Sequence, residues 1–125
     1  MKKVFISVAL LLLLLGCDGK TPKEVSFFET LKEKIGTQAM VLEIGSSSCR
    51  SCIKMKKMIE RLKQEDSSLP IYIIDVYDDM NVFREFNIQL IPTQIVLNKE
   101  GKEVHRHVGA IDADKMLQFV ELSKK

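Results

Sequence analysis

The sequence lacks several features that would point to particular classes of protein. Its 125 residues include no tryptophan, three prolines and two histidines, and no internal repeat is present. A chain of this length has room for one compact domain. The 19 Lys and Arg residues barely exceed the 17 Asp and Glu residues, and Lys2 and Lys3 fall in a segment that we expect to be removed. The remainder has no basic excess, which argues against a nucleic-acid partner.

No apolar run is long enough to span a membrane. The longest, residues 4–15, has about twelve residues, whereas a transmembrane helix needs roughly 20. Positive charge at Lys2 and Lys3 precedes this run, and Gly16 and Cys17 follow it directly. This order of charged, apolar and small residues predicts a secretory signal peptide.

The junction Leu14-Leu15-Gly16-Cys17 resembles the lipobox of bacterial lipoproteins, in which the cysteine is acylated and becomes the first residue of the mature chain. Leu15 departs from that pattern, and a plain secretory signal cut near Gly16 is the alternative. We expect residues 1–16 to be a lipoprotein signal peptide, residues 17–24 a lipidated tether and residues 25–125 the folded domain. Asp18 matches the enterobacterial rule for retention, so the resemblance implies a lipid anchor on the periplasmic side of the inner membrane.

Apolar spacing predicts alternating helices and strands beyond the tether. Helices are expected over residues 26–36, 53–64, 78–86 and 112–122, and strands over residues 40–44, 71–76, 93–97 and 103–108. A short first strand around Glu24 and Val25 is also considered. A helix follows each of the first two main strands, so these should be parallel, and the last two should form an antiparallel hairpin. The prediction is an α/β domain, a mixed central sheet flanked by helices on both faces.

Cys49 and Cys52 form a CxxC motif at the expected start of a helix that follows a strand, the context in which this spacing is redox-active. Unpaired N–H groups and the helix dipole would stabilise a thiolate on Cys49, and Arg50 adds positive charge. Cys49 is then the nucleophile that forms a mixed disulfide, and Cys52 the more buried thiol that resolves it. A purely structural disulfide is the alternative. A zinc site would need further Cys or His ligands, and Cys17 is committed to the N-terminus.

Ile91, Pro92 and Thr93 directly precede the strand expected at residues 93–97. A proline is unusual at a strand start, and a cis peptide bond would explain its place. Together with the CxxC motif, this segment resembles the thioredoxin family, whose fold has a cis-proline loop facing the CxxC motif. The resemblance implies a catalytic role for Pro92 and substrate contacts for Ile91 and Thr93.

Further matches extend the resemblance over residues 26–122. Glu43 lies six residues before Cys49, where thioredoxins carry a buried acid that relays a proton to the resolving cysteine, which implies this role for Glu43. Burial would raise its pKa, whereas an exposed strand edge is the alternative. Residues 98–101 match the hairpin turn. Gly109 matches the glycine segment beside the substrate groove, and substrate contact is implied there.

Three departures from the family pattern leave the redox potential and the choice of partner open. Ser48 stands where a tryptophan normally precedes CxxC, and Arg50 and Ser51 replace the common Gly-Pro pair. Ile71, or a residue near it, stands where many thioredoxins place a lysine close to the buried acid.

The resemblance implies thiol–disulfide exchange with protein substrates, in the reducing direction, with no cofactor beyond the redox-active disulfide and no metal. A reductase outside the cytoplasm needs electrons, so a membrane thiol donor is the implied partner. A disulfide-donating oxidase is an alternative, because Arg50 favours a stable thiolate.

A copper-binding assembly factor for respiratory complexes is a further alternative. His105 and His107 share one face of a strand, and Met55 and Met58 offer sulfur ligands near the CxxC motif. Helical spacing favours the methionines as core residues, and a solvent-facing pair is favoured for the histidines.

Overall fold

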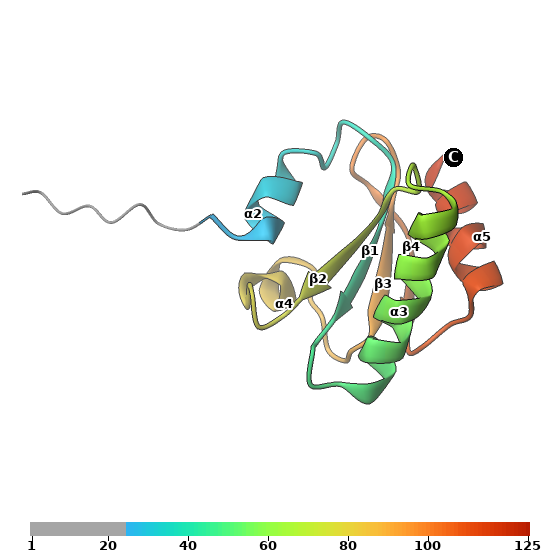
Figure 1. Ribbon diagram of the computed structural model, residues 1–125. Coiled ribbons are helices and arrows are strands. Elements are labelled where there is room, and N and C mark those ends of the chain that lie inside the picture. Colours follow the sequence, from blue (N-terminus) through green and yellow to red (C-terminus); the bar gives the residue numbers. More distant parts are fainter. Residues whose placement is uncertain (1–24) are drawn as a thin grey trace, which may run out of the picture.

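The computed structural model describes residues 25–125 (Figure 1). The signal peptide, the tether and the lipidated Cys17 expected from the sequence lie outside the described residues. Within residues 25–125, no helix is long and apolar enough to cross a bilayer.

The helices and strands follow the order expected from the sequence. The helices are α2 (Phe27–Lys32), α3 (Arg50–Glu65), α4 (Asn81–Glu85) and α5 (Ala113–Ser123), and the strands are β1 (Met40–Gly45), β2 (Ile71–Asp75), β3 (Thr93–Leu97) and β4 (Glu103–Val108). Helix α2 ends four residues earlier than expected, since the backbone turns after Lys32. Val25 belongs to no strand, so the short first strand considered there is wrong as far as the described residues reach.

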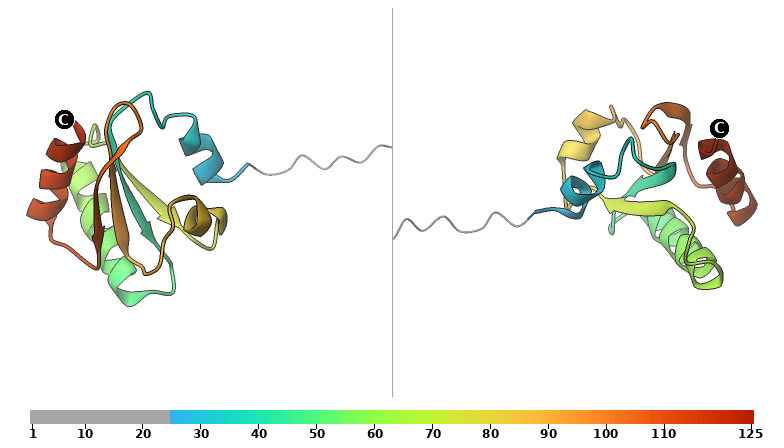
Figure 2. Two further views of the ribbon diagram at one scale, coloured as in Figure 1. Left: turned by 180° about the vertical axis from the view of Figure 1, so that it is seen from behind. Right: turned by 90° about the horizontal axis from the view of Figure 1, so that it is seen from above.

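The four strands form one mixed sheet in the order β2-β1-β3-β4. Strands β1 and β2 are parallel, and β3 pairs antiparallel with both β1 and β4. Both pairing predictions are therefore confirmed. Helices α2 and α4 lie on one side of the sheet, and α3 and α5 lie on the other (Figures 1 and 2).

The sheet has a hydrophobic core on each face, and the side chains of β1 point alternately into one and the other. Leu42 and Ile44 join the apolar side chains of α2 and α4 on one face. Val41 points to the other face and packs with α3 and α5. All six residues of β1 are buried, as expected for a strand covered on both sides.

Residues 25–125 hold both cores and all four strands of this sheet. The segment therefore has the hydrophobic interior of a domain that can fold alone. Glu43 lies on the α3 and α5 face of β1, two residues after Val41, and this places a carboxyl group beneath the start of α3.

Candidate active site

The loop between β1 and α3 is held by two hydrogen bonds that its backbone N–H groups donate, at the carboxyl ends of β1 and β2. The Cys49 N–H donates to the Ser46 carbonyl at 3.2 Å. The Ser47 N–H donates to Asp75 Oδ2, at the end of β2, at 2.8 Å. These two contacts position Cys49 at the start of α3.

Cys49 is the N-cap of α3, and its Sγ accepts a hydrogen bond from the Cys52 N–H at 3.3 Å. The hydroxyl of Ser51 also lies 3.3 Å from this sulfur. Because the first helical turn has N–H groups without partners in the helix, a sulfur at this position receives the donors that stabilise a thiolate. Helix α3 begins at Arg50, three residues earlier than the apolar pattern indicates, because Cys49 itself caps it.

Cys49 and Cys52 are joined by a disulfide, and their Cα atoms are 5.2 Å apart. Cys49 is half-buried, whereas Cys52 is only 6% exposed. An incoming disulfide can therefore reach Cys49 more easily than Cys52, which agrees with the order of attack expected from the sequence.

Gly45 was not singled out in the sequence, yet it lies directly against the second cysteine. A Cβ atom at residue 45 would stand 2.9 Å from Cys52 Cβ and 3.1 Å from its Sγ. Real Cβ contacts are longer than this, so only glycine lets β1 approach the start of α3 so closely.

The Ile91–Pro92 peptide bond is cis, as the sequence predicts. Thr93 pairs with Ile44, so the proline loop lies beside the carboxyl end of β1, where the cysteine loop begins. The Gly109 N–H donates to the Pro92 carbonyl at 2.8 Å, and Gly109 has a φ of +108°. The register thus brings Pro92 and Gly109 to the edge of the sheet that carries the cysteines.

Glu43 is buried, with 1% of its surface exposed, so the alternative of an exposed strand edge is wrong. Glu43 and Cys52 line the same cavity, whose volume is about 210 Å³. Burial raises the pKa of Glu43 from 4.5 to about 8, and a hydrogen bond from Gln94 opposes this rise. A carboxyl group with this pKa can exchange a proton near neutral pH.

Gln94 was not singled out from the sequence. It is completely buried, and it is the residue of β3 that pairs with Glu43. Its Nε2 donates to Glu43 Oε2 at 2.8 Å and to the Gly109 carbonyl at 3.1 Å. A polar residue within the apolar run at residues 93–97 was the only signal that could have identified it.

The strand register identifies the residue of β2 that lies beside the buried acid. Glu43 pairs with Ile73 on β2, whereas Ile71 pairs with Val41. The residue beside the buried acid on this side is therefore Ile73, and its side chain offers no charge.

An aromatic ring lies beside the cysteine loop even though no tryptophan precedes it. The Tyr77 hydroxyl lies 2.9 Å from Ser48 Oγ, which in turn lies 3.1 Å from Ser46 Oγ. Tyr77 follows β2 and is 65% exposed. Sequence analysis missed this residue because it is far from the motif along the chain.

His105 and His107 do not form the solvent-facing pair that was favoured from the sequence. Both are half-buried, and their rings lie 4.8 and 6.1 Å from the ring of Phe119 on α5. Met55 belongs to the same core, and its sulfur accepts the Ile111 N–H at 3.3 Å. In the part of the chain described, no three His, Cys, Asp or Glu side chains are grouped so that they could hold a metal.

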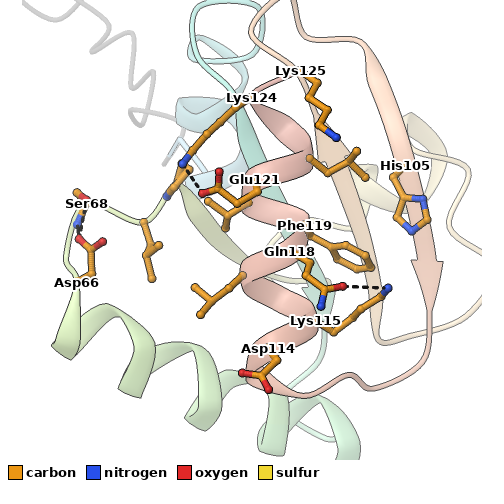
Figure 3. Close-up of a pocket in the computed structure, with 15 residues that line it drawn as sticks. Asp66, Ser68, His105, Asp114, Lys115, Gln118, Phe119, Glu121, Lys124 and Lys125 are labelled. Carbon is orange, nitrogen blue, oxygen red and sulfur yellow. Dashed lines mark hydrogen bonds and ion pairs between the residues drawn. The ribbon is translucent and has the colours of Figure 1, made fainter.

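A wider hollow of about 970 Å³ lies between α5 and the loop at residues 66–70 (Figure 3). Phe119 and His105 are among the residues that line it, and charged side chains such as Lys124 and Glu121 lie around it. Neither cysteine nor Glu43 lines this hollow, whereas Cys52 and Glu43 both line the smaller cavity.

Comparisons with known proteins agree with this arrangement. The family model of the thioredoxin-like domain matches residues 27–124. Thioredoxin from Chlamydia caviae is 28% identical over 92 residues, which cover 74% of this chain and 89% of that protein. Thioredoxin-2 from Saccharomyces cerevisiae is 31% identical over 75 residues, which cover 60% of this chain and 71% of that protein.

Solved structures show the same fold. Fasciola hepatica thioredoxin aligns with a TM-score of 0.63 and 22% identity, covering 78% of this chain and 90% of that one. Plasmodium falciparum thioredoxin aligns with a TM-score of 0.64 and 20% identity, covering 78% and 94%. The expected thioredoxin fold is confirmed, and with the Cys49–Cys52 pair it marks a thiol–disulfide oxidoreductase. The chain belongs to the thioredoxin-like family.

Proposed function

We propose that this protein is an extracytoplasmic reductase of protein disulfides. The observation that carries the proposal is the joint placement of three groups: the half-buried Cys49 at the N-cap of α3, its disulfide partner Cys52, and Glu43 in the same cavity as Cys52. A structural disulfide alone would require neither an accessible sulfur at a helix N-terminus nor a buried acid next to its partner.

The exchange begins from the reduced pair. The Cys49 thiolate attacks one sulfur of the substrate disulfide, the substrate S–S bond breaks, and the first substrate thiolate leaves and takes up a proton. Cys52 then loses its proton and attacks Cys49 Sγ in the mixed disulfide, which releases the second substrate thiolate. Two electrons pass to the substrate, and Cys49 and Cys52 end as the disulfide.

Glu43 is the proton acceptor for Cys52 in this scheme. Both side chains line the 210 Å³ cavity, and the pKa of the carboxyl, about 8, lies close to the ordinary value of a thiol. A small difference between the two pKa values means that the proton can pass in either direction at little cost. The same carboxyl can therefore return the proton when the disulfide is reduced again.

The reducing direction is supported by the acid at Glu43, by Ile91 before the cis-proline, and by relatives named thioredoxin. Arg50 favours the opposite direction, because positive charge beside Cys49 stabilises its thiolate and hence the reduced pair. The potential of the pair decides between these effects.

A location outside the cytoplasm is proposed from residues 1–17, where an apolar segment leads to a lipobox-like junction at Cys17. The protein would be held on the periplasmic side of the inner membrane through a lipidated Cys17. Its electrons would come from a dithiol of a membrane protein, since the compartment itself is oxidising. Labelling of the full chain with a radioactive fatty acid, with Cys17→Ala as the control, tests the anchor.

The function is tested by the equilibrium reduction potential of residues 25–125. A potential near −270 mV, roughly that of thioredoxin, supports a reductase, whereas one near −120 mV, about that of strong oxidants, makes the protein a disulfide donor. In parallel, Cys52→Ser should accumulate mixed disulfides through Cys49, and Cys49→Ser should not. If neither variant traps a protein substrate and copper binding depends on both cysteines, the copper-carrier alternative is favoured.

A further inference from the structure

We propose that Gln94 is a positioning residue that joins the Glu43 carboxyl to the Gly109 carbonyl and so couples the proton on the buried acid to the loop beside the cis-proline. The inference rests on the proposed role of Glu43 in thiol–disulfide exchange. The Gln94 amide donates to Glu43 and to Gly109 rather than to a cysteine, so it acts through these two residues.

The first argument is the cost of burying this amide. Gln94 has no exposed surface and lies on the face of the sheet that α3 and α5 cover. An amide removed from water destabilises the fold unless its hydrogen-bonding groups find partners. An apolar residue would fill an interior strand position more simply, so the amide at residue 94 calls for a specific use.

The second argument is geometric. Both bonds of Gln94 Nε2 lead to groups of the candidate site, since Glu43 Oε2 is 2.8 Å away and the Gly109 carbonyl is 3.1 Å away. Gly109 is in turn bonded through its N–H to the Pro92 carbonyl at 2.8 Å. Gln94 thus completes a continuous chain of hydrogen bonds from the buried acid to the cis-proline loop.

The third argument concerns the two protonation states of Glu43. An ionised carboxylate accepts the Nε2 bond strongly, whereas a protonated carboxyl needs an acceptor for its own hydrogen. Within residues 25–125, neither Gln94 Oε1 nor Glu43 Oε1 has a hydrogen-bond partner. Rotation of the amide would turn Gln94 Oε1 toward a protonated carboxyl, and the same rotation would remove the donor from the Gly109 carbonyl. A proton on Glu43 Oε2 and the donation from Gln94 to Gly109 therefore exclude each other.

Charged groups around the acid do not offer an equivalent link. Lys56 of α3, Asp75 of β2 and Asp78 of the following loop line the cavity of Glu43, and His107 of β4 pairs with Gln94. The side chains of these four residues make no hydrogen bond to the Glu43 carboxyl or to the Gln94 amide group. The displacement of the Glu43 pKa comes from burial, which raises it, and from Gln94, which lowers it.

The test replaces Gln94 by methionine, which has a similar shape and no donor. In the oxidised segment 25–125, the pKa of Glu43 should rise by about one pH unit in Gln94→Met, because the charged form loses its one hydrogen-bond donor. Carboxyl carbon NMR measures this value directly. The backbone N–H signals of Gly109 and Ala110 should titrate together with Glu43 in the wild type and lose that titration in the variant.

Val96→Ala is the matched control, because Val96 is buried on the same face of β3 and offers no polar group. It should lower stability while leaving both titrations unchanged. Gln94→Asn, which keeps a shorter amide, should give a smaller rise in the same direction and serves if Gln94→Met does not fold. The inference is overturned if the pKa of Glu43 is unchanged in these variants, or if the backbone N–H signal of Gly109 does not change with pH in the wild type.

The oxidised protein needs no substrate for this titration. Failure of the Gln94 variants to shift the Glu43 pKa would therefore leave the reductase proposal standing. Failure of Cys49 to trap a substrate, with the NMR titrations as expected, would overturn the proposed function alone.

Discussion

Replacement of Glu43 by glutamine should stabilise the oxidised protein at neutral pH and remove most of the fall in stability between pH 5 and pH 7. The carboxyl is 1% exposed, and burial raises its pKa from 4.5 to about 8. Below pH 4.5 the group is protonated in the folded and the unfolded chain alike, so its contribution to folding is greatest there. Between the two pKa values the unfolded chain ionises while the folded chain stays protonated, and stability falls as pH rises.

The magnitude follows from the two pKa values. Each pH unit between them costs about 1.4 kcal/mol, so the free energy of unfolding should fall by about 2.5 kcal/mol from pH 5 to pH 7. Glutamine is neutral at every pH and should be free of this loss. At pH 7 the advantage of Glu43→Gln over the wild type should therefore approach about 3 kcal/mol.

Urea unfolding of the oxidised segment 25–125 at pH 5, 6 and 7 measures the difference. Glu60→Gln is the control, since Glu60 is an exposed acid on α3 whose carboxylate lies 4.0 Å from Lys56 Nζ. Its stability curve should stay parallel to that of the wild type. Parallel curves for the wild type and Glu43→Gln would refute the reasoning, because they would mean that the folded protein holds Glu43 ionised over this range.

Three further variants test the local geometry. Gly45→Ala should destabilise the oxidised protein by about 1–3 kcal/mol in urea unfolding, because the new Cβ would lie 2.9 Å from Cys52 Cβ, and an unchanged stability would contradict that close approach. Ser51→Ala should slow alkylation of reduced Cys49 several-fold at pH 6, since it removes a hydroxyl 3.3 Å from the sulfur, whereas an equal rate would show that the hydroxyl does not support the thiolate. Asp112→Ala removes the N-cap of α5 and should cost about 1 kcal/mol without changing the alkylation rate, and a slower rate would mean that α5 reaches the site.

Much of the fold could be predicted because it depends on local patterns. The strands expected at residues 93–97 and 103–108 match those of the structure. Both segments contain β-branched residues, and turn residues separate them. Helix ends were less predictable. Whether α3 begins at Arg50 depends on the conformation of Cys49 as its cap, and hydrophobic periodicity contains no information about this.

The residues of the candidate site also fall into two groups, those that the sequence can identify and those that it cannot. Cys49, Cys52, Glu43 and Pro92 could be named from spacing within the chain and from the family resemblance, although their roles stay predictions. Gln94 and Tyr77 could not, because each meets its partner through the pairing of segments that are far apart in sequence. The histidines were placed wrongly for a related reason. Strand alternation shows that they share a face, but not that Phe119 of α5 covers it.

The row of residues across the sheet at Glu43 shows which strand neighbours this buried acid has. On one side the register partner is Ile73, and on the other it is Gln94, which donates to the carboxyl. The polar neighbour of the acid in this row is therefore a neutral amide on β3. A carboxyl paired with a cation depends on charge, whereas this one depends on burial and one neutral donor. Because screening by salt acts on charge pairs, the pKa of Glu43 should vary little with ionic strength, and the proton transfer to and from Cys52 should be equally insensitive to salt.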